Sequence, residues 1–229
     1  MIKYYGHSAF ELQLDGYKIL IDPWISNPLS QEKPANVKGV DVIIVTHGHG
    51  DHIGDVAVIA RNNPKAKIVA IYELAEHLGK LIGDPARAVG GNIGGPMVVE
   101  GVSLKIALTP AVHSSPYGAP TGIVIMGKEL TVYHAGDTSV MMDMKLIGEI
   151  YRPQIAMLPI GGHFTMDPVE AAKAAELLLP KVVIPMHYAT FPVLYGRPEE
   201  LEALIKQRGL PVKVRAMRPG EVLDPKQMF

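Results

Sequence analysis

The chain has 229 residues, 48% of them hydrophobic, and its 22 basic and 23 acidic side chains leave a formal net charge of -1. This length allows one large core, so a single domain over residues 1–229 is expected. The balanced charge argues against a nucleic-acid partner, because phosphate backbones are met by basic surfaces. Cysteine is absent, which excludes disulfides and thiolate ligands, so any metal would be held by histidine and carboxylate.

No apolar run reaches the roughly 18 residues that a membrane span needs, and no charged-then-apolar leader opens the sequence. The sequence therefore predicts a cytoplasmic protein without membrane association. Its eleven methionines, including Met141, Met142 and Met144, are typical of core filler. Methionine-rich or apolar helix faces would equally suit the interface of a homo-oligomer. The sequence is compatible with their burial in the core and with their burial in such an interface.

The first 45 residues predict β-structure. Short segments with strand character open the chain, at residues 2–5, 9–14 and 17–21. Asp15-Gly16 is typical of a two-residue hairpin turn, and the stretch 26–38, rich in Pro, Asn and Ser, is expected to be a loop. Residues 40–45 are almost continuously apolar and β-branched, which indicates a strand buried on both faces of a sheet.

From residue 40 onward strands alternate with helical segments, expected at residues 54–61, 72–80, 140–151, 168–179 and 198–208. Asp167 as N-cap and Pro168 in the first turn begin one of these helices. The glycine-rich segment 90–96 is expected to be a loop and lacks the Lys-Ser/Thr ending of a nucleotide-binding loop. An antiparallel opening followed by strand-helix alternation, repeated after about residue 100, predicts an α/β fold with two packed sheets and helices outside.

Directly after the strand at residues 40–45, the sequence reads His-Gly-His-Gly-Asp-His. The carboxyl end of a buried strand is the edge at which open α/β sheets bind ligands. His47 and His49 could clasp one cation, while Asp51 and His52 could reach a second, and imidazole with carboxylate suits zinc, manganese or iron. We therefore expect a metal site here rather than an incidental polar loop, because four ionisable groups beside a buried strand need a partner for their charge.

This motif resembles the His-x-His-x-Asp-His signature of the metallo-β-lactamase superfamily. Further histidines and an aspartate follow strand-like segments in the order expected of that family, with His113 after residues 102–109, Asp137 after 130–136 and His187 after 182–186. The resemblance implies the αββα sandwich. It also implies two divalent metal ions, with Zn²⁺ first and Mn²⁺, Ni²⁺ or Fe²⁺ as alternatives. One ion would be held by His47, His49 and His113, the other by Asp51, His52 and His187, and Asp137 would bridge them.

Within the superfamily, three motifs are similar to small metal-dependent hydrolases related to the ascorbate-phosphate lactonase branch. They are Tyr5-Gly6-His7-Ser8-Ala9-Phe10, Ile21-Asp22-Pro23-Trp24, and Gly161-Gly162-His163-Phe164-Thr165-Met166-Asp167-Pro168. On this basis His7 is expected beside the metals, and His163 as a proton donor to the leaving group or an anion contact. A structural histidine bonded to backbone is the other interpretation of each.

Other residues near these motifs have two interpretations each. Asp22 would support the histidine loop or cap a turn, and Trp24 would pack that loop or form a substrate wall. Tyr188 and Phe191, just after His187, are expected to be pocket walls. His134 would lie near the ligands or in the core, and His77 is expected on the solvated surface.

The site predicts a hydrolase in which a metal-bridging hydroxide, oriented by Asp51, cleaves an ester, lactone or phosphodiester bond of a small molecule. A nucleic-acid phosphodiesterase or ribonuclease is the nearest alternative. A diiron redox protein is a further one, although diiron relatives tend to carry Glu where this chain has His49. A metal-binding sensor without turnover is the last, and the competent side chains at all seven ligand positions argue against it.

Overall fold

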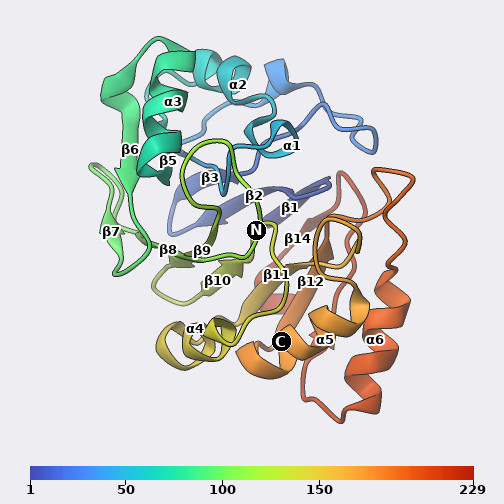
Figure 1. Cartoon of the computed structure of the whole chain (residues 1–229). Coiled ribbons are helices and arrows are strands. Elements are labelled where there is room, and N and C mark those ends of the chain that lie inside the picture. The colour runs from blue at the N-terminus through green and yellow to red at the C-terminus, as the bar shows by residue number, and fades with distance from the viewer.

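A computed structural model describes residues 1–229, in which two seven-stranded sheets stack face to face (Figure 1). The first sheet has the order β14-β1-β2-β3-β4-β5-β6. Its strands are β14 (Val222–Leu223), β1 (Ile2–Gly6), β2 (Ala9–Leu14), β3 (Tyr17–Ile21), β4 (Val42–Ile44), β5 (Lys67–Ile71) and β6 (Ala88–Gly91). The pairs from β14 to β3 are antiparallel, and those from β3 to β6 are parallel.

The second sheet repeats this plan in the order β13-β12-β11-β10-β9-β8-β7. Its strands are β7 (Met97–Val98), β8 (Lys105–Pro110), β9 (Thr121–Met126), β10 (Thr131–His134), β11 (Ile155–Pro159), β12 (Val182–Met186) and β13 (Lys213–Val214). The pairs from β7 to β10 are antiparallel and those from β10 to β13 are parallel. Each sheet therefore has a parallel half whose strands all end on one side.

Helices cover the outer face of each sheet (Figure 1). The first sheet carries α1 (Gly50–Ile53), α2 (Val56–Asn62) and α3 (Tyr72–Ile82), and the second carries α4 (Asp143–Tyr151), α5 (Pro168–Leu178) and α6 (Pro198–Gln207). Short 3-10 helices lie at Pro34–Asn36, Pro85–Arg87 and Pro225–Gln227. The longest helices have 11 residues, and none is both long and apolar enough to cross a membrane.

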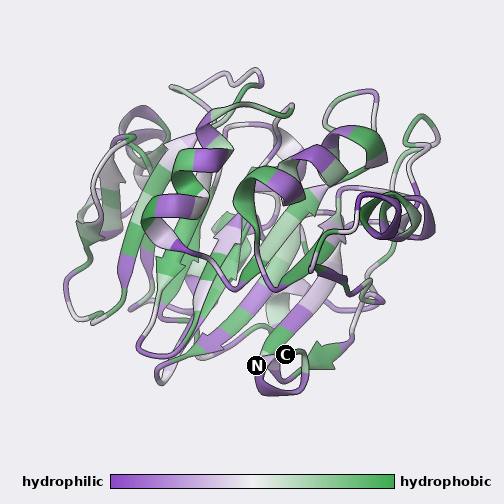
Figure 2. Ribbon diagram, turned by 90° about the horizontal axis from the view of Figure 1, so that it is seen from below, coloured by the Kyte–Doolittle hydropathy of each residue, from purple (hydrophilic) through white to green (hydrophobic).

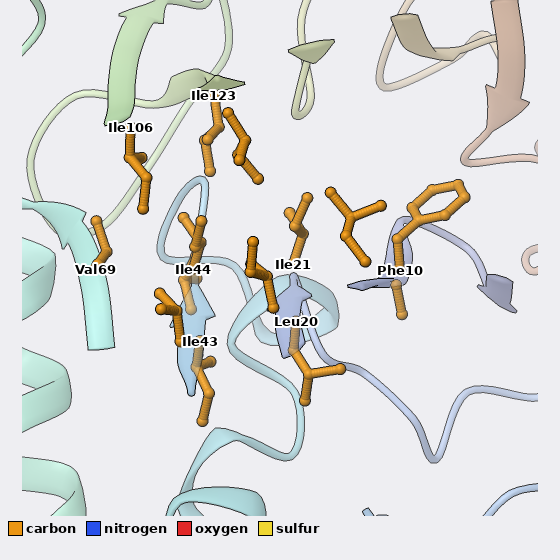
Figure 3. Close-up of a cluster of buried hydrophobic side chains, with 14 of the residues drawn as sticks. Phe10, Leu20, Ile21, Ile43, Ile44, Val69, Ile106 and Ile123 are labelled. Carbon is orange, nitrogen blue, oxygen red and sulfur yellow. The ribbon is translucent and has the colours of Figure 1, made fainter. Parts of the chain in front are cut away.

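The core between the sheets follows from the two-residue period of the strands. On β8, Ile106 and Leu108 belong to the large cluster shared with the first sheet, whereas Ala107 between them packs under the helices of the second sheet. Figure 3 shows Ile106 and Ile123 pointing from the second sheet toward Ile44 of the first. Green strands lie behind helices of mixed purple and green in the hydropathy view (Figure 2), as expected of elements that bury one face.

The α/β sandwich predicted from the sequence is confirmed, and so is the hairpin turn. Leu14 pairs with Tyr17, and Asp15 and Gly16 both have positive φ, of 50° and 87°. The N-cap prediction is also confirmed, because the Asp167 carboxylate accepts a hydrogen bond from the Glu170 N–H at 2.9 Å. The hairpin turn and the N-cap can be predicted from the sequence because each is determined by one or two neighbouring residues.

The loop predicted at residues 90–96 is wrong at its first two positions. Gly90 and Gly91 belong to strand β6, where Gly91 leaves room for the Met97 side chain. The helix expected at residues 54–61 is present as α2 (Val56–Asn62), and the additional helix α1 precedes it across Gly54, where φ is 47°. A Cβ at Gly54 would lie 2.5 Å from the Trp24 Cα, so the close approach of this backbone separates α1 from α2.

Candidate metal centre

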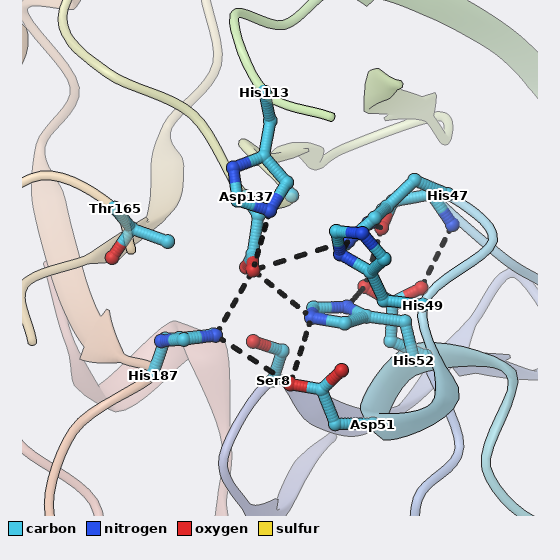
Figure 4. A network of polar contacts seen from close by, with 12 residues as sticks. Ser8, His47, His49, Asp51, His52, His113, Asp137, Thr165 and His187 are labelled. Atoms are coloured by element: carbon cyan, nitrogen blue, oxygen red, sulfur yellow. Dashed lines mark hydrogen bonds and ion pairs between the residues drawn. The ribbon is translucent and has the colours of Figure 1, made fainter. Parts of the chain in front are cut away.

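The residues predicted as metal ligands gather at one end of the sandwich, where loops from both sheets meet (Figure 4). The first sheet supplies the segment that follows β4. The second sheet supplies His113 after β8, Asp137 after β10 and His187 after β12. The parallel strands β4, β10 and β12 direct their carboxyl ends to this place, as α/β ligand sites commonly require.

Three buried residues at this end have left-handed backbone conformations. His7, Asp22 and His187 follow β1, β3 and β12 and have φ of 56°, 45° and 56°. A residue other than glycine in this region costs about 1–3 kcal/mol, and such residues concentrate at functional sites. The turns therefore indicate that the surrounding structure imposes these side-chain positions.

The segment after β4 forms a short helix rather than the loop expected from the sequence. His49 is its N-cap residue, and Asp51 and His52 lie on α1. Gly48 packs closely against the β8–β9 connection, since a Cβ at this position would be 2.8 Å from the Tyr117 ring. The Gly48 N–H also donates to Ser115 Oγ at 3.2 Å.

His47, His49 and His113 form the first group of donors, whose donor atoms lie within 4.8 Å of one another. His47 Nε2 and His49 Nδ1 are 2.9 Å apart. The His113 ring is 5.1 Å from each of the other two rings and nearly perpendicular to both. Three imidazoles that converge in this way match the first ligand set implied by the resemblance.

His7, Asp51, His52 and His187 form the second group. Asp51 Oδ2 is 2.9 Å from His7 Nε2 and 3.8 Å from both His52 Nε2 and His187 Nε2. His7 is fully buried, and its Nδ1 lies 2.6 Å from Thr190 Oγ1. The structure therefore adds His7 to the three residues that the resemblance implies for the second ion.

Asp137 lies between the two groups (Figure 4). Its Oδ2 is 3.0 Å from His187 Nε2, 3.3 Å from His52 Nε2, 3.5 Å from His113 Nε2 and 3.9 Å from His47 Nε2. Asp137 also forms a third group of donors with His47 and His52, one from each of the other two. A single carboxylate oxygen thus approaches imidazoles of both groups.

Asp22 supports the histidine segment, which is one of the two roles expected from the sequence. Its Oδ2 accepts hydrogen bonds from His52 Nδ1 and Thr46 Oγ1, each at 2.7 Å, and its Oδ1 accepts one from the Thr46 N–H at 2.8 Å. Thr46 Oγ1 is also 3.0 Å from His47 Nδ1. Contacts to the far side of a metal-binding imidazole fix its orientation and tautomer.

The electrostatics of the cluster favour anionic carboxylates and keep two of the buried imidazoles, His7 and His47, neutral. Burial alone would raise the pKa values of Asp22, Asp51 and Asp137, but neighbouring histidines outweigh it and hold all three below their usual values. Burial lowers the pKa of His47 to about 2 and that of His7 to about 4. These protonation states are the ones that coordinate cations.

Unpaired buried atoms provide a test of whether a metal fits. His52 Nε2, both ring nitrogens of His187 and Asp137 Oδ1 are buried without a hydrogen-bond partner. Buried polar atoms without partners are rare, because each costs about 1–3 kcal/mol. Imidazole nitrogens and carboxylate oxygens suit zinc and similar ions, so the residues present fit the metals that the resemblance implies.

Comparison with known proteins settles the family. The family model described as the beta-lactamase superfamily domain matches residues 17–188. The chain belongs to the β-lactamase superfamily. Among members of the superfamily, it is 55% identical over 231 residues to a "UPF0173 metal-dependent hydrolase" of Aeropyrum pernix, with 96% of this chain and 95% of that protein covered.

A solved structure is similar over the whole length. Igni18, described as a novel metallo hydrolase from Ignicoccus hospitalis, is 46% identical, with a TM-score of 0.89 and coverage of 97% of this chain and 96% of that one. An isothiocyanate hydrolase from Delia radicum gut bacteria has a TM-score of 0.76 at 19% identity, with 97% and 98% covered, and shares the fold. The narrower resemblance to the lactonase branch stays a prediction.

In this superfamily member a cavity of about 820 Å³ opens onto the donors. It is lined by Trp24, His49, Gly50, Asp51, His113, Ser114, Asp137, Phe164, His187, Phe191 and Val193. Phe191 forms a wall as predicted, and Trp24 takes its alternative role as a wall. Tyr188 does not line this cavity but packs with the cluster beneath the second sheet's helices, so that prediction is wrong.

His163 lies away from the donors. It is exposed, it makes no hydrogen bond, and its ring contacts Phe164 edge-on at 4.4 Å between centroids. Its role as a proton donor stays a prediction. His134 is buried and donates from Nε2 to the Ser8 carbonyl at 3.0 Å, while His77 is half-buried under Tyr117, with the rings stacked at 3.8 Å, rather than solvated.

Several residues at the site are not assigned a role from the sequence. Ser114, whose Oγ is 3.3 Å from His49 Nε2, and Thr190 both lie in irregular segments after a predicted ligand. Phe164 and Val193 reach the cavity from long loops. For Ser114 and Thr190, proximity to His113 and His187 along the chain is the one signal that could have found them.

Proposed function

We propose that this chain is a metal-dependent hydrolase that holds two divalent ions, most readily Zn²⁺, and cleaves an ester, lactone or phosphodiester bond of a small molecule. The observation that carries this proposal is the position of Asp137 Oδ2, which is within 4 Å of imidazole Nε2 atoms from both donor groups. Two adjacent groups joined by one carboxylate suit a pair of ions better than a single one. The names of the similar hydrolases support the same reading.

The proposed ligands of the two ions divide as the family resemblance implies. His47, His49 and His113 would hold one ion, Asp51, His52 and His187 the other, and Asp137 would contact both. Bound divalent ions lower the pKa of a coordinated water and polarise a substrate carbonyl or phosphoryl oxygen. Mn²⁺, Ni²⁺ and Fe²⁺ are the alternatives to Zn²⁺, because the same donors accept them.

The remaining residues position this machinery. Asp51 lines the cavity and is held on its other side by His7, which Thr190 orients in turn. A carboxylate fixed in this way can accept a hydrogen bond from a water and direct its lone pair toward the substrate. Asp22 holds His52 from behind and accepts a hydrogen bond from the Thr46 hydroxyl. The protein thus supplies orientation, which accounts for much of the rate in well-aligned reactions.

The volume of the cavity supports a small-molecule substrate, since about 820 Å³ lies within the range of about 300–1,000 Å³ typical of such sites. A cytoplasmic location is part of this proposal. A homo-oligomer stays a prediction.

The test is metal content per chain by elemental mass spectrometry, together with hydrolysis of 4-nitrophenyl esters, lactones and bis(4-nitrophenyl) phosphate. We expect about two ions in the wild type and fewer in Asp137→Ala, with turnover lost in parallel. Asp143→Asn, an exposed carboxylate change on α4, is the matched control and should keep both. Bound iron with no hydrolysis would favour redox chemistry, and two ions with no turnover of any substrate would favour a sensor.

A further inference from the structure

The cavity over the donors has an aromatic wall built from two distant segments. The rings of Trp24 and Phe191 are stacked, with centroids 5.8 Å apart and an angle of 24° between their planes. Both rings meet His7 edge-on, at 5.2 Å and 5.4 Å. Because His7 is buried and bonded to Asp51, this wall is fixed directly beside the second donor group.

Two further apolar side chains line the cavity while remaining open to solvent. Phe164 is 51% exposed and Val193 is 45% exposed. Large apolar side chains exposed together at a cavity mouth commonly mark a surface that is covered when a ligand binds. Phe164 is presented by a tight turn, in which Gly162 and His163 have φ of 68° and 62°. Together with the aromatic wall, these side chains give the cavity an apolar surface on several sides.

The cavity contains no cationic side chain for an anionic substrate. None of its lining residues is Lys or Arg, and Ser114 supplies its one side-chain hydroxyl. Sites that recognise phosphate or carboxylate usually place Arg or Lys against the anion. Apart from the proposed ions, the cavity therefore offers an anion no charged partner, whereas it offers an uncharged group extensive apolar contact.

We infer that the substrate of this site is an uncharged molecule with an aromatic or aliphatic arm. The bond that is hydrolysed belongs to a carboxylic ester or lactone rather than to a phosphodiester. The arm lies between the wall of Trp24 and Phe191 and the Phe164 side chain. In the reaction, the oxygen of water bonds to the acyl carbon and the bond from that carbon to the alcohol oxygen breaks. The alcohol leaves with one proton of the water, and the other proton is released from the acid. This inference rests on the proposed hydrolase function.

The first experiment uses the metal-loaded protein and substrates that share one leaving group. kcat/KM is measured for 4-nitrophenyl acetate, butyrate and hexanoate and for bis(4-nitrophenyl) phosphate. We expect kcat/KM to rise with chain length by up to about fourfold per methylene, the limit set by burial of one CH₂ group, mainly through KM. After each kcat/KM is divided by the rate constant of uncatalysed hydrolysis, the phosphodiester should show an enhancement at least about a hundredfold smaller, a gap of about 2.7 kcal/mol.

A pair of variants assigns the effect to the cavity. Phe164→Ser should flatten the dependence on chain length. Leu146→Ser, on α4 away from the cavity and with a similar exposure of 55%, should keep the wild-type dependence. A flat series in the wild type, or preference for the phosphodiester, would overturn the inference while leaving the hydrolase proposal intact.

Binding can be followed without turnover, because Trp24 is the only tryptophan of the chain. Its fluorescence is titrated with 4-nitrobenzyl alcohol, an uncharged quencher, and with 4-nitrophenyl phosphate. Saturable quenching by the alcohol at lower concentration than by the phosphate, weakened in Phe164→Ser, is expected. If the alcohol binds in this way but no ester is hydrolysed, the hydrolase proposal fails and the preference for an uncharged ligand stands. Tighter binding of the phosphate would overturn that preference.

Discussion

His52 donates a hydrogen bond from Nδ1 to Asp22 Oδ2 at 2.7 Å, and both side chains are fully buried. Its other ring nitrogen, Nε2, faces Asp137 Oδ2 at 3.3 Å, so each nitrogen of this ring lies beside a carboxylate. Burial alone would lower the pKa of His52, but Asp137 and Asp22 outweigh it and raise that pKa above its usual value. Asp22 thus aims His52 at the centre of the site and supplies negative charge behind it.

Asp22→Asn should weaken metal binding without unfolding the protein. The amide keeps the shape but removes the charge, and losing such a partner behind a ligating histidine commonly costs about 10–100-fold in metal affinity. Competition with a chromophoric chelator measures this change, and circular dichroism checks the fold. Asp143→Asn is the control. Unchanged affinity in Asp22→Asn would show that His52 is oriented by its own packing.

Replacement of Gly48 and of Gly50 by alanine should change the free energy of unfolding in opposite directions, although the two residues are only two positions apart. A Cβ at Gly48 would be 2.8 Å from the Tyr117 ring and 3.0 Å from Pro116, so Gly48→Ala should cost about 1–3 kcal/mol of unfolding free energy. A Cβ at Gly50 meets nothing within 4 Å, and alanine in helix α1 should be neutral or stabilise by about 0.5–1 kcal/mol. Urea denaturation measures both. Equal effects would contradict the close packing of the Gly48 segment.

His7 and His163 should differ when each is replaced by asparagine. Both have a left-handed backbone, which asparagine tolerates, so strain is matched. His7→Asn loses the hydrogen bond to Asp51 and should lower kcat by about tenfold or more, the range of a misplaced catalytic group. His163 is exposed and unbonded, so His163→Asn should stay within about twofold of wild type in kcat and metal content. A hundredfold loss in His163→Asn would instead support the proton-donor role predicted from the sequence.

Removal of metal should lower thermal stability. Binding to the folded state alone contributes about 2.7 kcal/mol when free ion is a hundredfold above its Kd. For a chain of this size, that corresponds to a Tm decrease of about 5–11 °C on chelation. Differential scanning calorimetry with and without EDTA measures it. In Asp137→Ala, EDTA should lower the Tm by much less than in the wild type. If EDTA lowers the Tm of both proteins equally, the stabilising ion is bound elsewhere.

The convergence of the predicted ligands can be anticipated from the sequence, because they follow strands. His47, His113, Asp137 and His187 come directly or shortly after β4, β8, β10 and β12, and strand ends meet where the sheet topology requires. Once the strands are recognised, the positions of these side chains follow from the fold class. Asp22 follows β3 for the same reason. The sequence therefore predicts the donors, and the structure adds how they are grouped.

The walls of the cavity are harder to predict, because long loops depend on tertiary contacts. Tyr188 shows the difficulty. His187 and Ala189 on either side of it have positive φ, so the chain turns twice and Tyr188 packs beneath the second sheet, while Phe191 reaches the cavity. Similarly, the break between α1 and α2 depends on contact between Gly54 and Trp24, residues 30 positions apart. No local pattern encodes such contacts.

The donors come from both sheets, and the backbone N–H of His187 donates to the carbonyl of His7 at 2.8 Å where the sheets meet. Ions held there would fasten the two layers at one rim, as a disulfide would, in a chain that has no cysteine. At the opposite rim, the two layers are joined by hydrogen bonds such as that from the Lys128 N–H to Asp15 Oδ2 at 2.8 Å. Hydrogen exchange of β4 and β12 should therefore slow when ions bind, while the far ends of the same strands continue to open at their own rate.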